Sequence, residues 1–294
     1  MSKLTRRDFL KASTAVATSV AVGGFLGGCE TKASSPVHSD ASDKSKAYKV
    51  RTVVFSPTGG TMNAAYHMAK KLSDDVEIID QTSLSDRSEQ FTFRSDELVL
   101  LAAPCYMKSI PYVKDLFTNL KGDHTPCIVV SAFGNRACEN NFAQTKAIAE
   151  ANGFITIGAI SLVTPHVRGA RIGHGRPNLE DHKIMQEFAD KLLEKLSAGN
   201  FNSIPVEPMT DRGEHPHSED EKIYIEETCV HCGLCAEKCP VGAIDSQTMA
   251  IDPNLCISCQ RCSYVCPVNA RNFIVDRNAV DNKYYSPQSV SYVL

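Results

Sequence analysis

Short β-branched and apolar runs alternate with amphipathic stretches along the chain from Tyr48 onward. The runs predict five strands, at 48–55, 75–80, 97–103, 126–132 and 154–161. The amphipathic stretches predict helices at 61–73, 110–120, 138–152 and 178–197. Such alternation is typical of a parallel sheet with helices on both faces, so we expect an α/β, doubly wound domain over 48–197.

The first 29 residues have a different pattern. Arg6 and Arg7 precede the uncharged, weakly apolar stretch from Ala12 to Gly28, which is short for a membrane-spanning helix and favours a targeting segment. This arrangement resembles a twin-arginine export signal. Leu26-Gly27-Gly28-Cys29 resembles the lipobox of bacterial lipoproteins, which implies that Cys29 carries lipid. The alternative is a chance cysteine after a small-residue cleavage site.

The rest of the chain divides by composition. Residues 30–47 are rich in Ser, Ala, Lys and Asp without apolar periodicity, which indicates a flexible tether. A Gly- and Pro-bearing linker is expected at 198–221, a second domain at 222–276 and a C-terminal tail at 277–294.

Overall composition excludes two classes of protein. The 294 residues are 43% hydrophobic and 22% charged, which argues against a disordered chain. Residues 1–29 carry four basic groups and one acidic group, so without them the formal net charge falls from −3 to −6. A negative chain is a poor partner for polyanions, and we expect no nucleic-acid binding.

The first predicted strand runs directly into a loop suited to phosphate, whose residues are Ser56, Pro57, Thr58, Gly59, Gly60 and Thr61. Its hydroxyls can donate to phosphate oxygens, its glycines allow close backbone approach, and the following helix N-terminus favours an anion. The loop lacks both the dinucleotide and the nucleotide-triphosphate fingerprints, so a phosphomonoester is the expected ligand.

This loop is similar to the FMN phosphate loop of flavodoxins, Ser/Thr-x-Thr-Gly-Asn-Thr, with Gly60 where Asn is usual. The resemblance implies a flavodoxin-like sheet of order 2-1-3-4-5 that binds FMN. It also implies that Pro104, Cys105, Tyr106 and Met107 cover one side of the flavin ring, and that Gly134, Asn135 and Arg136 meet its pyrimidine edge. The alternatives are an ordinary rim aromatic for Tyr106 and a solvated helix-start residue for Arg136.

The loop at 164–177 follows the fifth predicted strand and contains three arginines and two histidines. It is a candidate for binding an anionic substrate or for docking an acidic partner or domain. A solvated connection is the other interpretation.

Eight of the twelve cysteines lie between Cys229 and Cys266, in two Cys-x2-Cys-x2-Cys-x3-Cys-Pro runs offset by 27 residues. This spacing resembles that of bacterial two-cluster ferredoxins, in which the fourth cysteine of each run binds the other cluster. The implied ligands are Cys229, Cys232, Cys235 and Cys266 for the first [4Fe-4S] cluster, and Cys239, Cys256, Cys259 and Cys262 for the second. The alternatives are structural zinc or disulfides. Cys105, Cys127 and Cys138 remain outside these sets and Cys29, and packing is their expected role. Because Cys105 and Cys138 lie in the proposed flavin loops, the alternative is that either one tunes or reacts with the flavin.

The whole chain resembles bacterial flavodoxin and ferredoxin fusion proteins, which implies electron transfer. The first hypothesis is an exported electron carrier, lipid-anchored on the outer face of the cytoplasmic membrane, that relays electrons between a redox partner protein, two clusters and FMN. The second is a flavin-dependent reductase of a small-molecule substrate held by Arg136 or the loop at 168–176. The third is a binding module without redox chemistry.

Overall fold

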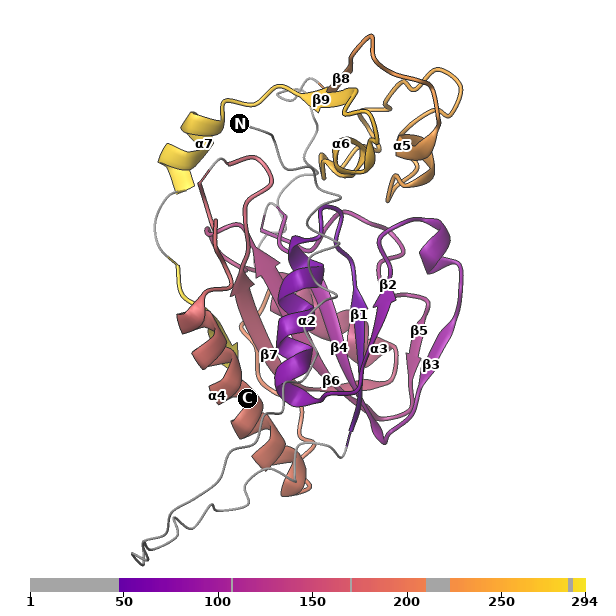
Figure 1. The fold of residues 1–294 in the computed structure, drawn as a ribbon. Helices are drawn as coiled ribbons and strands as arrows, with labels where there is room; N and C mark the ends of the chain where they lie inside the picture. Colours follow the sequence, from indigo (N-terminus) through magenta and orange to yellow (C-terminus); the bar gives the residue numbers. More distant parts are fainter. Residues whose placement is uncertain (1–47, 107, 170, 210–222, 285–287) are drawn as a thin grey trace, which may run out of the picture. The chain divides into compact units, whose positions relative to one another are not determined.

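The largest sheet contains five parallel strands and a sixth, antiparallel one. In the computed structural model, which describes residues 48–106, 108–169, 171–209, 223–284 and 288–294, the strand order is β10-β7-β6-β4-β1-β2 (Figure 1). The strands are β1 (Lys49–Val54), β2 (Val76–Asp80), β4 (Glu97–Pro104), β6 (Thr125–Phe133), β7 (Phe154–Val163) and β10 (Ser291–Val293). Strand β10 pairs antiparallel with β7, so the predicted count of five strands was one too low.

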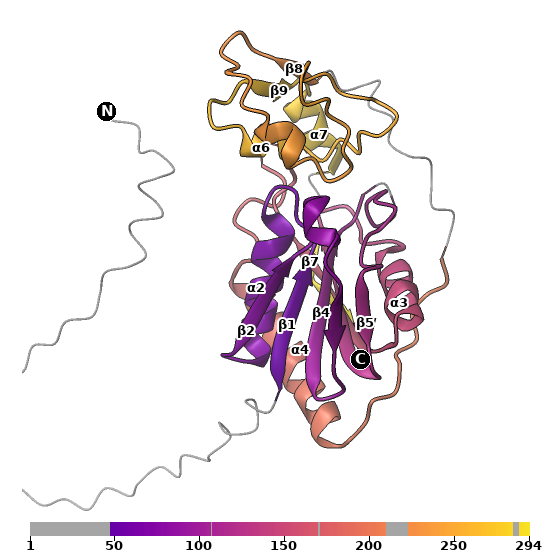
Figure 2. The same ribbon diagram turned by 90° about the vertical axis from the view of Figure 1, so that its right-hand side faces the viewer.

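Helices cover both faces of this sheet. The α2 (Gly60–Leu72) and α4 (Leu179–Ser197) helices pack on one face and α3 (Asn141–Ala151) on the other (Figure 2). Alternate strand residues divide between the faces: Leu98 and Leu100 belong to the core beneath α2 and α4, and Val99 and Leu101 to the opposite core. Because β4 and β6 are buried on both faces, their sequences are almost continuously apolar.

The predicted helix at 110–120 is wrong. The structure has turns there, followed by β5 (Leu120–Gly122), which pairs in parallel with β3 (Phe91–Phe93). Phe117 is fully buried with a φ of 63°, which no α-helix accommodates. The Asn152 side chain donates to the Phe117 carbonyl at 2.8 Å. Tertiary packing therefore overrides the local helical pattern.

Residues 223–273 form a smaller portion with an internal repeat in its backbone. Its elements are β8 (Ile223–Ile225), α5 (Leu234–Glu237), α6 (Arg261–Val265) and β9 (Arg271–Phe273), and β8 pairs antiparallel with β9. Residues with a positive φ, in the left-handed backbone region, recur at the 27-residue offset of the cysteine runs. The pairs are His231 and Ser258, Gly233 and Gln260, and Gly242 and Asn269. The repeat in the sequence is thus a repeat in conformation.

The C-terminal tail folds onto the large sheet. It contributes α7 (Arg277–Tyr284) as well as β10. The centroids of the Tyr292 ring and of the Phe188 ring of α4 lie 5.4 Å apart. The buried Asp281 of α7 forms an ion pair with Arg171 at 3.3 Å. The tail therefore belongs to the folded body.

Several predicted features lie outside the described residues. They are the export signal with Cys29, the tether at 30–47, Met107 and the end of the linker from 210 onward. No helix in the parts of the chain that the structure describes is both long enough and apolar enough to cross a membrane.

One buried arginine connects the large sheet to the cysteine-rich portion. Arg87 follows β2 in a short 3-10 turn, η1 (Ser85–Arg87), and is 4% exposed. Its guanidinium donates to the carbonyls of Gln81, Thr82 and Ser83, to that of Pro240 in the cysteine-rich portion, and to Asp115 at 3.0 Å. A reciprocal bond joins Arg261 to the Pro57 carbonyl at 3.0 Å.

We expect Arg87→Met to lower the free energy of unfolding by about 1–3 kcal/mol, because it leaves buried carbonyls without a donor. Urea unfolding of the purified protein measures this loss. Arg94→Met is the matched control, since the Arg94 side chain is exposed and forms its ion pair with the neighbouring Asp96. Equal losses in the two variants would contradict a joining role for Arg87.

Candidate functional site

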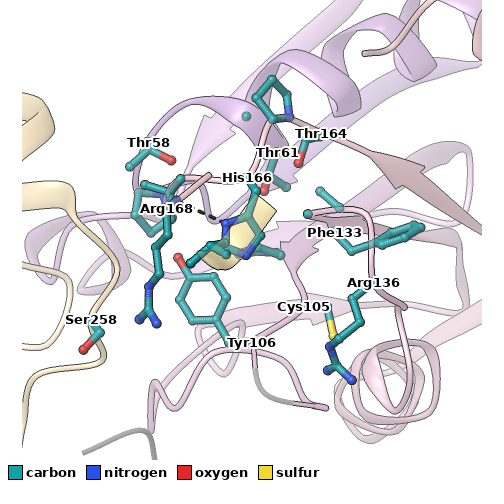
Figure 3. A pocket seen from close by; sticks show the side chains of 18 of the residues that line it. Thr58, Thr61, Cys105, Tyr106, Phe133, Arg136, Thr164, His166, Arg168 and Ser258 are labelled. Carbon is teal, nitrogen blue, oxygen red and sulfur yellow. Dashed lines mark hydrogen bonds between the residues drawn. The ribbon is translucent and has the colours of Figure 1, made fainter. Parts of the chain in front are cut away.

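A cavity of about 380 Å³ lies at the carboxyl ends of β1, β4, β6 and β7 (Figure 3). Ligands of open α/β sheets bind at this edge, and the volume is in the range of small-molecule sites. Most of the predicted FMN residues line it: Ser56, Thr58, Gly60, Thr61, Pro104, Cys105, Tyr106, Gly134 and Arg136. Gly59 and Asn135 are not among the lining residues, and Met107 lies outside the described ones.

The loop after β1 is arranged to receive an anion. Gly59, whose φ is 85°, is the N-cap of α2. Because glycine has no side chain, the N-cap residue offers no side-chain acceptor to the first N–H groups of the helix. The first N–H groups of a helix have no partner within it. Within the part of the chain that the structure describes, the Met62 N–H is the one N–H of this first turn that donates to a nearby hydroxyl, that of Ser56 at 3.0 Å. Thr58 and Thr61 line the cavity beside this helix start, so a phosphate fits there.

The loop after β4 presents Tyr106 to the cavity. Its backbone N–H donates to the Ser109 carbonyl at 2.6 Å, which closes a tight turn. Burial raises the pKa of Tyr106 well above its usual value, so the phenol stays neutral. Burial likewise raises the pKa of Cys105 to about 12 and that of Cys138 above its usual value, so neither is a reactive thiolate at neutral pH.

The loop after β6 contributes less than predicted. Asn135 is buried, and its side-chain oxygen accepts from Gln288 N of the tail at 3.2 Å. Arg136 lines the cavity but pairs with Glu139 at 2.7 Å, so much of its charge is already balanced. Gly134 is required by packing, because a Cβ there would lie 2.2 Å from His166 Cδ2.

The loop after β7 forms a further wall, through Thr164, His166 and Arg168 (Figure 3). His166 Nδ1 accepts from Arg168 N at 3.1 Å, and burial lowers the pKa of His166 to about 4. The loop's other arginines are held elsewhere, Arg171 by Asp281 and Arg176 by Asp181. This loop, a candidate for anion binding or for docking, is therefore part cavity wall and part anchor. Its position after the fifth parallel strand was the signal for this role.

The cysteine-rich portion contributes a wall that the sequence did not predict. Ile257 and Ser258 lie between Cys256 and Cys259, and both line the cavity. Cys259 and Ile257 share a core cluster with residues of β1 and β4, and Tyr106 packs against the same cluster. Ala279, Val280 and Lys283 of α7 complete the lining.

The second predicted set of cluster cysteines is buried and mutually close. Cys239, Cys256, Cys259 and Cys262 are each at most 9% exposed. Burial raises the pKa of Cys259 above its usual value, and the charges of Cys262, Cys239 and Cys256 raise it further. The thiols that influence Cys259 are thus its three partners in the predicted set. Four thiols drawn together across both runs fit a shared cluster.

The first predicted set surrounds a separate, small space. Cys229, Cys232, Cys235 and Cys266 all line it, and Cys232 is exposed. The Ala270 N–H donates to Cys266 Sγ at 3.1 Å, as the Ala243 N–H does to Cys239 Sγ at 3.3 Å. Within the described residues, no three His, Cys, Asp or Glu side chains are placed to hold a single metal ion.

Comparison with known proteins identifies two segments. Residues 228–270 match the 4Fe-4S dicluster domain. This part of the chain is a 4Fe-4S ferredoxin domain. Residues 3–23 match the TAT (twin-arginine translocation) pathway signal sequence, which indicates export across the cytoplasmic membrane. No curated protein matches the sequence.

Two solved structures resemble about half of this chain. One is a flavodoxin of Streptococcus pneumonia TIGR4, 18% identical, with 50% of this chain and 98% of that chain covered and a TM-score of 0.34. The other is a putative flavoprotein from Bacteroides uniformis ATCC 8492, 13% identical, with 49% and 99% covered and a TM-score of 0.31.

We expect folding stability to fall as the pH is lowered from about 6.5 to about 4, by up to about 1.4 kcal/mol per pH unit, because the unfolded chain protonates at His166 before the folded chain does. Above this window the stability is fully present. His166→Asn removes this component while keeping an acceptor for Arg168 N. Urea unfolding of the wild type and of His166→Asn at pH 7 and pH 5 measures this pH-dependent part of the stability. His124→Asn is the control, because His124 is exposed. An unchanged pH dependence in His166→Asn would contradict a neutral, buried imidazole.

Proposed function

We propose that this protein is an exported, membrane-tethered electron-transfer flavoprotein that relays electrons between two [4Fe-4S] clusters and FMN. One observation carries the proposal: Ile257 and Ser258, from between two cluster cysteines, line the same cavity as the phosphate loop and Tyr106. A cluster ligand loop and a flavin site thus share one wall. FMN exchanges electrons singly or in pairs and each cluster exchanges one, so their combination converts between the two modes.

The flavin end of the proposal rests on this chain's own residues. Thr58, Thr61 and the start of α2 would hold the phosphate, and Tyr106 would lie against the ring. Gly60 replaces the Asn that is usual in flavodoxins. A Cβ there would meet only Thr164, at 3.6 Å, so the position tolerates side chains and does not exclude FMN.

The exposure of the two cysteine sets supports an order for the relay. All four cysteines of the second set are buried, and Cys259 belongs to the core cluster against which Tyr106 packs. In the first set Cys232 is exposed, beside Val230, which is 63% exposed. The second set would therefore exchange electrons with the flavin, and the first with a redox partner protein.

The export signal and Cys29 support a location for this partner. Twin-arginine export accepts folded cargo, which suits a protein that receives its cofactors before crossing. With lipid on Cys29, the protein would be anchored on the outer face of the cytoplasmic membrane, near a membrane redox chain.

Anaerobic purification without residues 1–29, followed by flavin extraction and iron counting, tests the proposal. We expect one FMN and about eight irons per chain, with reduction of both kinds of cofactor visible by optical and EPR spectroscopy. Iron without flavin would overturn the flavin half of the relay.

Cys232→Ser tests the order of the relay. We expect it to lose the first cluster, about four irons, while FMN is retained and dithionite still reduces the flavin. Flavin reduction by a reduced bacterial ferredoxin, used as a protein donor, should slow at least tenfold. Cys127→Ser is the matched control, because Cys127 is buried in β6 and belongs to neither set. An unchanged rate with the protein donor would contradict entry through the first cluster.

A second candidate function is reduction of a small anionic substrate. Arg168 and Lys283 line the cavity although no predicted FMN loop contains them. If they hold a substrate, Arg168→Gln should raise KM for it at least tenfold without loss of bound FMN, in assays with an artificial donor and a panel of small carboxylates and oxyanions. Loss of FMN in this variant would instead place Arg168 at the cofactor.

A further inference from the structure

Arg271 is a buried cation between the two cysteine sets. It begins β9 and is 4% exposed. Its guanidinium donates to the Met249 carbonyl at 2.8 Å and to Cys235 Sγ, of the first set, at 3.5 Å. It also lines the space that the first set surrounds. The same side chain therefore fixes the backbone of this portion and contacts a predicted cluster ligand.

The charge of Arg271 has no carboxylate partner among the ion pairs of the described residues. A buried cation is costly unless an anion balances it. The nearby sulfur atoms are the available source of negative charge. The charge of Arg271 also acts on Cys262, of the second set. Arg271 is thus electrostatically coupled to both sets and hydrogen-bonded to the first.

The internal repeat makes this cation an asymmetric feature. The 27-residue offset relates Arg271 to Ile244 and Cys235 to Cys262. Ile244 is buried and packs in one core cluster with Cys262. Each half contains the same backbone bond to sulfur. The Ala243 N–H donates to Cys239 Sγ in one half, and the Ala270 N–H donates to Cys266 Sγ in the other. The two sites therefore share their backbone bonds and differ in this side chain, apolar at one and cationic at the other.

We propose that Arg271 is a positioning residue that balances the negative charge of the cluster held by the first set and raises its reduction potential above that of the second. The inference rests on the proposed function only in requiring both clusters. Adding an electron makes a thiolate-bound cluster more negative, and a buried positive charge with a bond to a ligand sulfur favours that reduced state. In the proposed relay, the higher reduction potential of the first cluster means that an electron resides at equilibrium on this exposed cluster.

The experiment is a redox titration monitored by EPR on Arg271→Gln and Arg271→Ile, the latter copying the residue of the other half. We expect the potential of the first cluster to fall by at least ~59 mV, a tenfold shift of its one-electron equilibrium. The second cluster should shift less. In the Cys232→Ser background, which leaves the second cluster, Arg271→Gln should have only this smaller effect. Arg271→Lys should keep most of the original potential, because it keeps the charge.

Lys238→Gln is the matched control, since it removes one positive charge from an exposed pair with Glu237 in the same portion, where solvent screens it. Unchanged potentials in Arg271→Gln with eight irons per chain would overturn the inference, as would equal shifts of both clusters. If Arg271→Gln and Arg271→Ile lose iron, Arg271→Lys becomes the deciding variant. A full iron count in Arg271→Lys together with a lowered potential of the first cluster would also overturn the inference. A wild-type protein without two clusters would refute the proposed function instead.

Discussion

The proposed relay depends on one packing interaction, the burial of the loop between Cys256 and Cys259 against the carboxyl end of the parallel sheet. Ile257 is 2% exposed and belongs to the same core as Val53 and Phe55. Hydrophobic burial is not directional, so polar contacts must fix the orientation. Arg87 and Arg261 supply them, each donating across the same junction to a proline carbonyl. The loop between two predicted cluster cysteines thereby becomes one wall of the cavity.

The cysteine-rich portion shows how one sequence repeat can produce two unlike sites. Both halves use left-handed residues at the same offsets and the same backbone bonds to sulfur. Burial differs, because all four cysteines of one set are buried, with Cys259 in a core of the large sheet, and the other set includes the exposed Cys232. Charge differs as well, through Arg271 and Ile244. In the proposed relay, exposure would decide which site a partner can approach, and charge would decide which site holds an electron more readily.

The C-terminal tail also holds one wall of the cavity in place. Asp281 holds the loop after β7 through Arg171, and Arg176 donates to the Gln288 carbonyl. These bonds fix the backbone that carries His166 and Arg168. The contact between Gly134 and His166 then determines how closely the loops after β6 and β7 can approach each other. A neutral imidazole suits this contact, because protonation of Nδ1 would remove the acceptor for Arg168 N.

Local sequence determined the features that depend on neighbouring residues. The alternation of apolar runs predicted the five parallel strands, because a strand buried on both faces must be apolar throughout. The phosphate loop and the two cysteine runs were evident from spacing, since both need several residues in one short segment. The same reasoning failed at 110–120, where burial of Phe117 imposes turns, and at β10, whose three residues are too few to show a pattern.

Tertiary structure alone decided which distant segments meet. No spacing in the sequence places Ile257 beside Tyr106, Asp281 beside Arg171, or Arg87 beside Pro240. These contacts join residues far apart in the chain, and they form because each segment buries a surface that its own neighbours cannot cover. The sequence by itself thus specified a ferredoxin domain, an export signal and a phosphate-loop pattern. Their union around one cavity, and the unequal burial and charge of the two cysteine sets, follow from packing that only the folded chain contains.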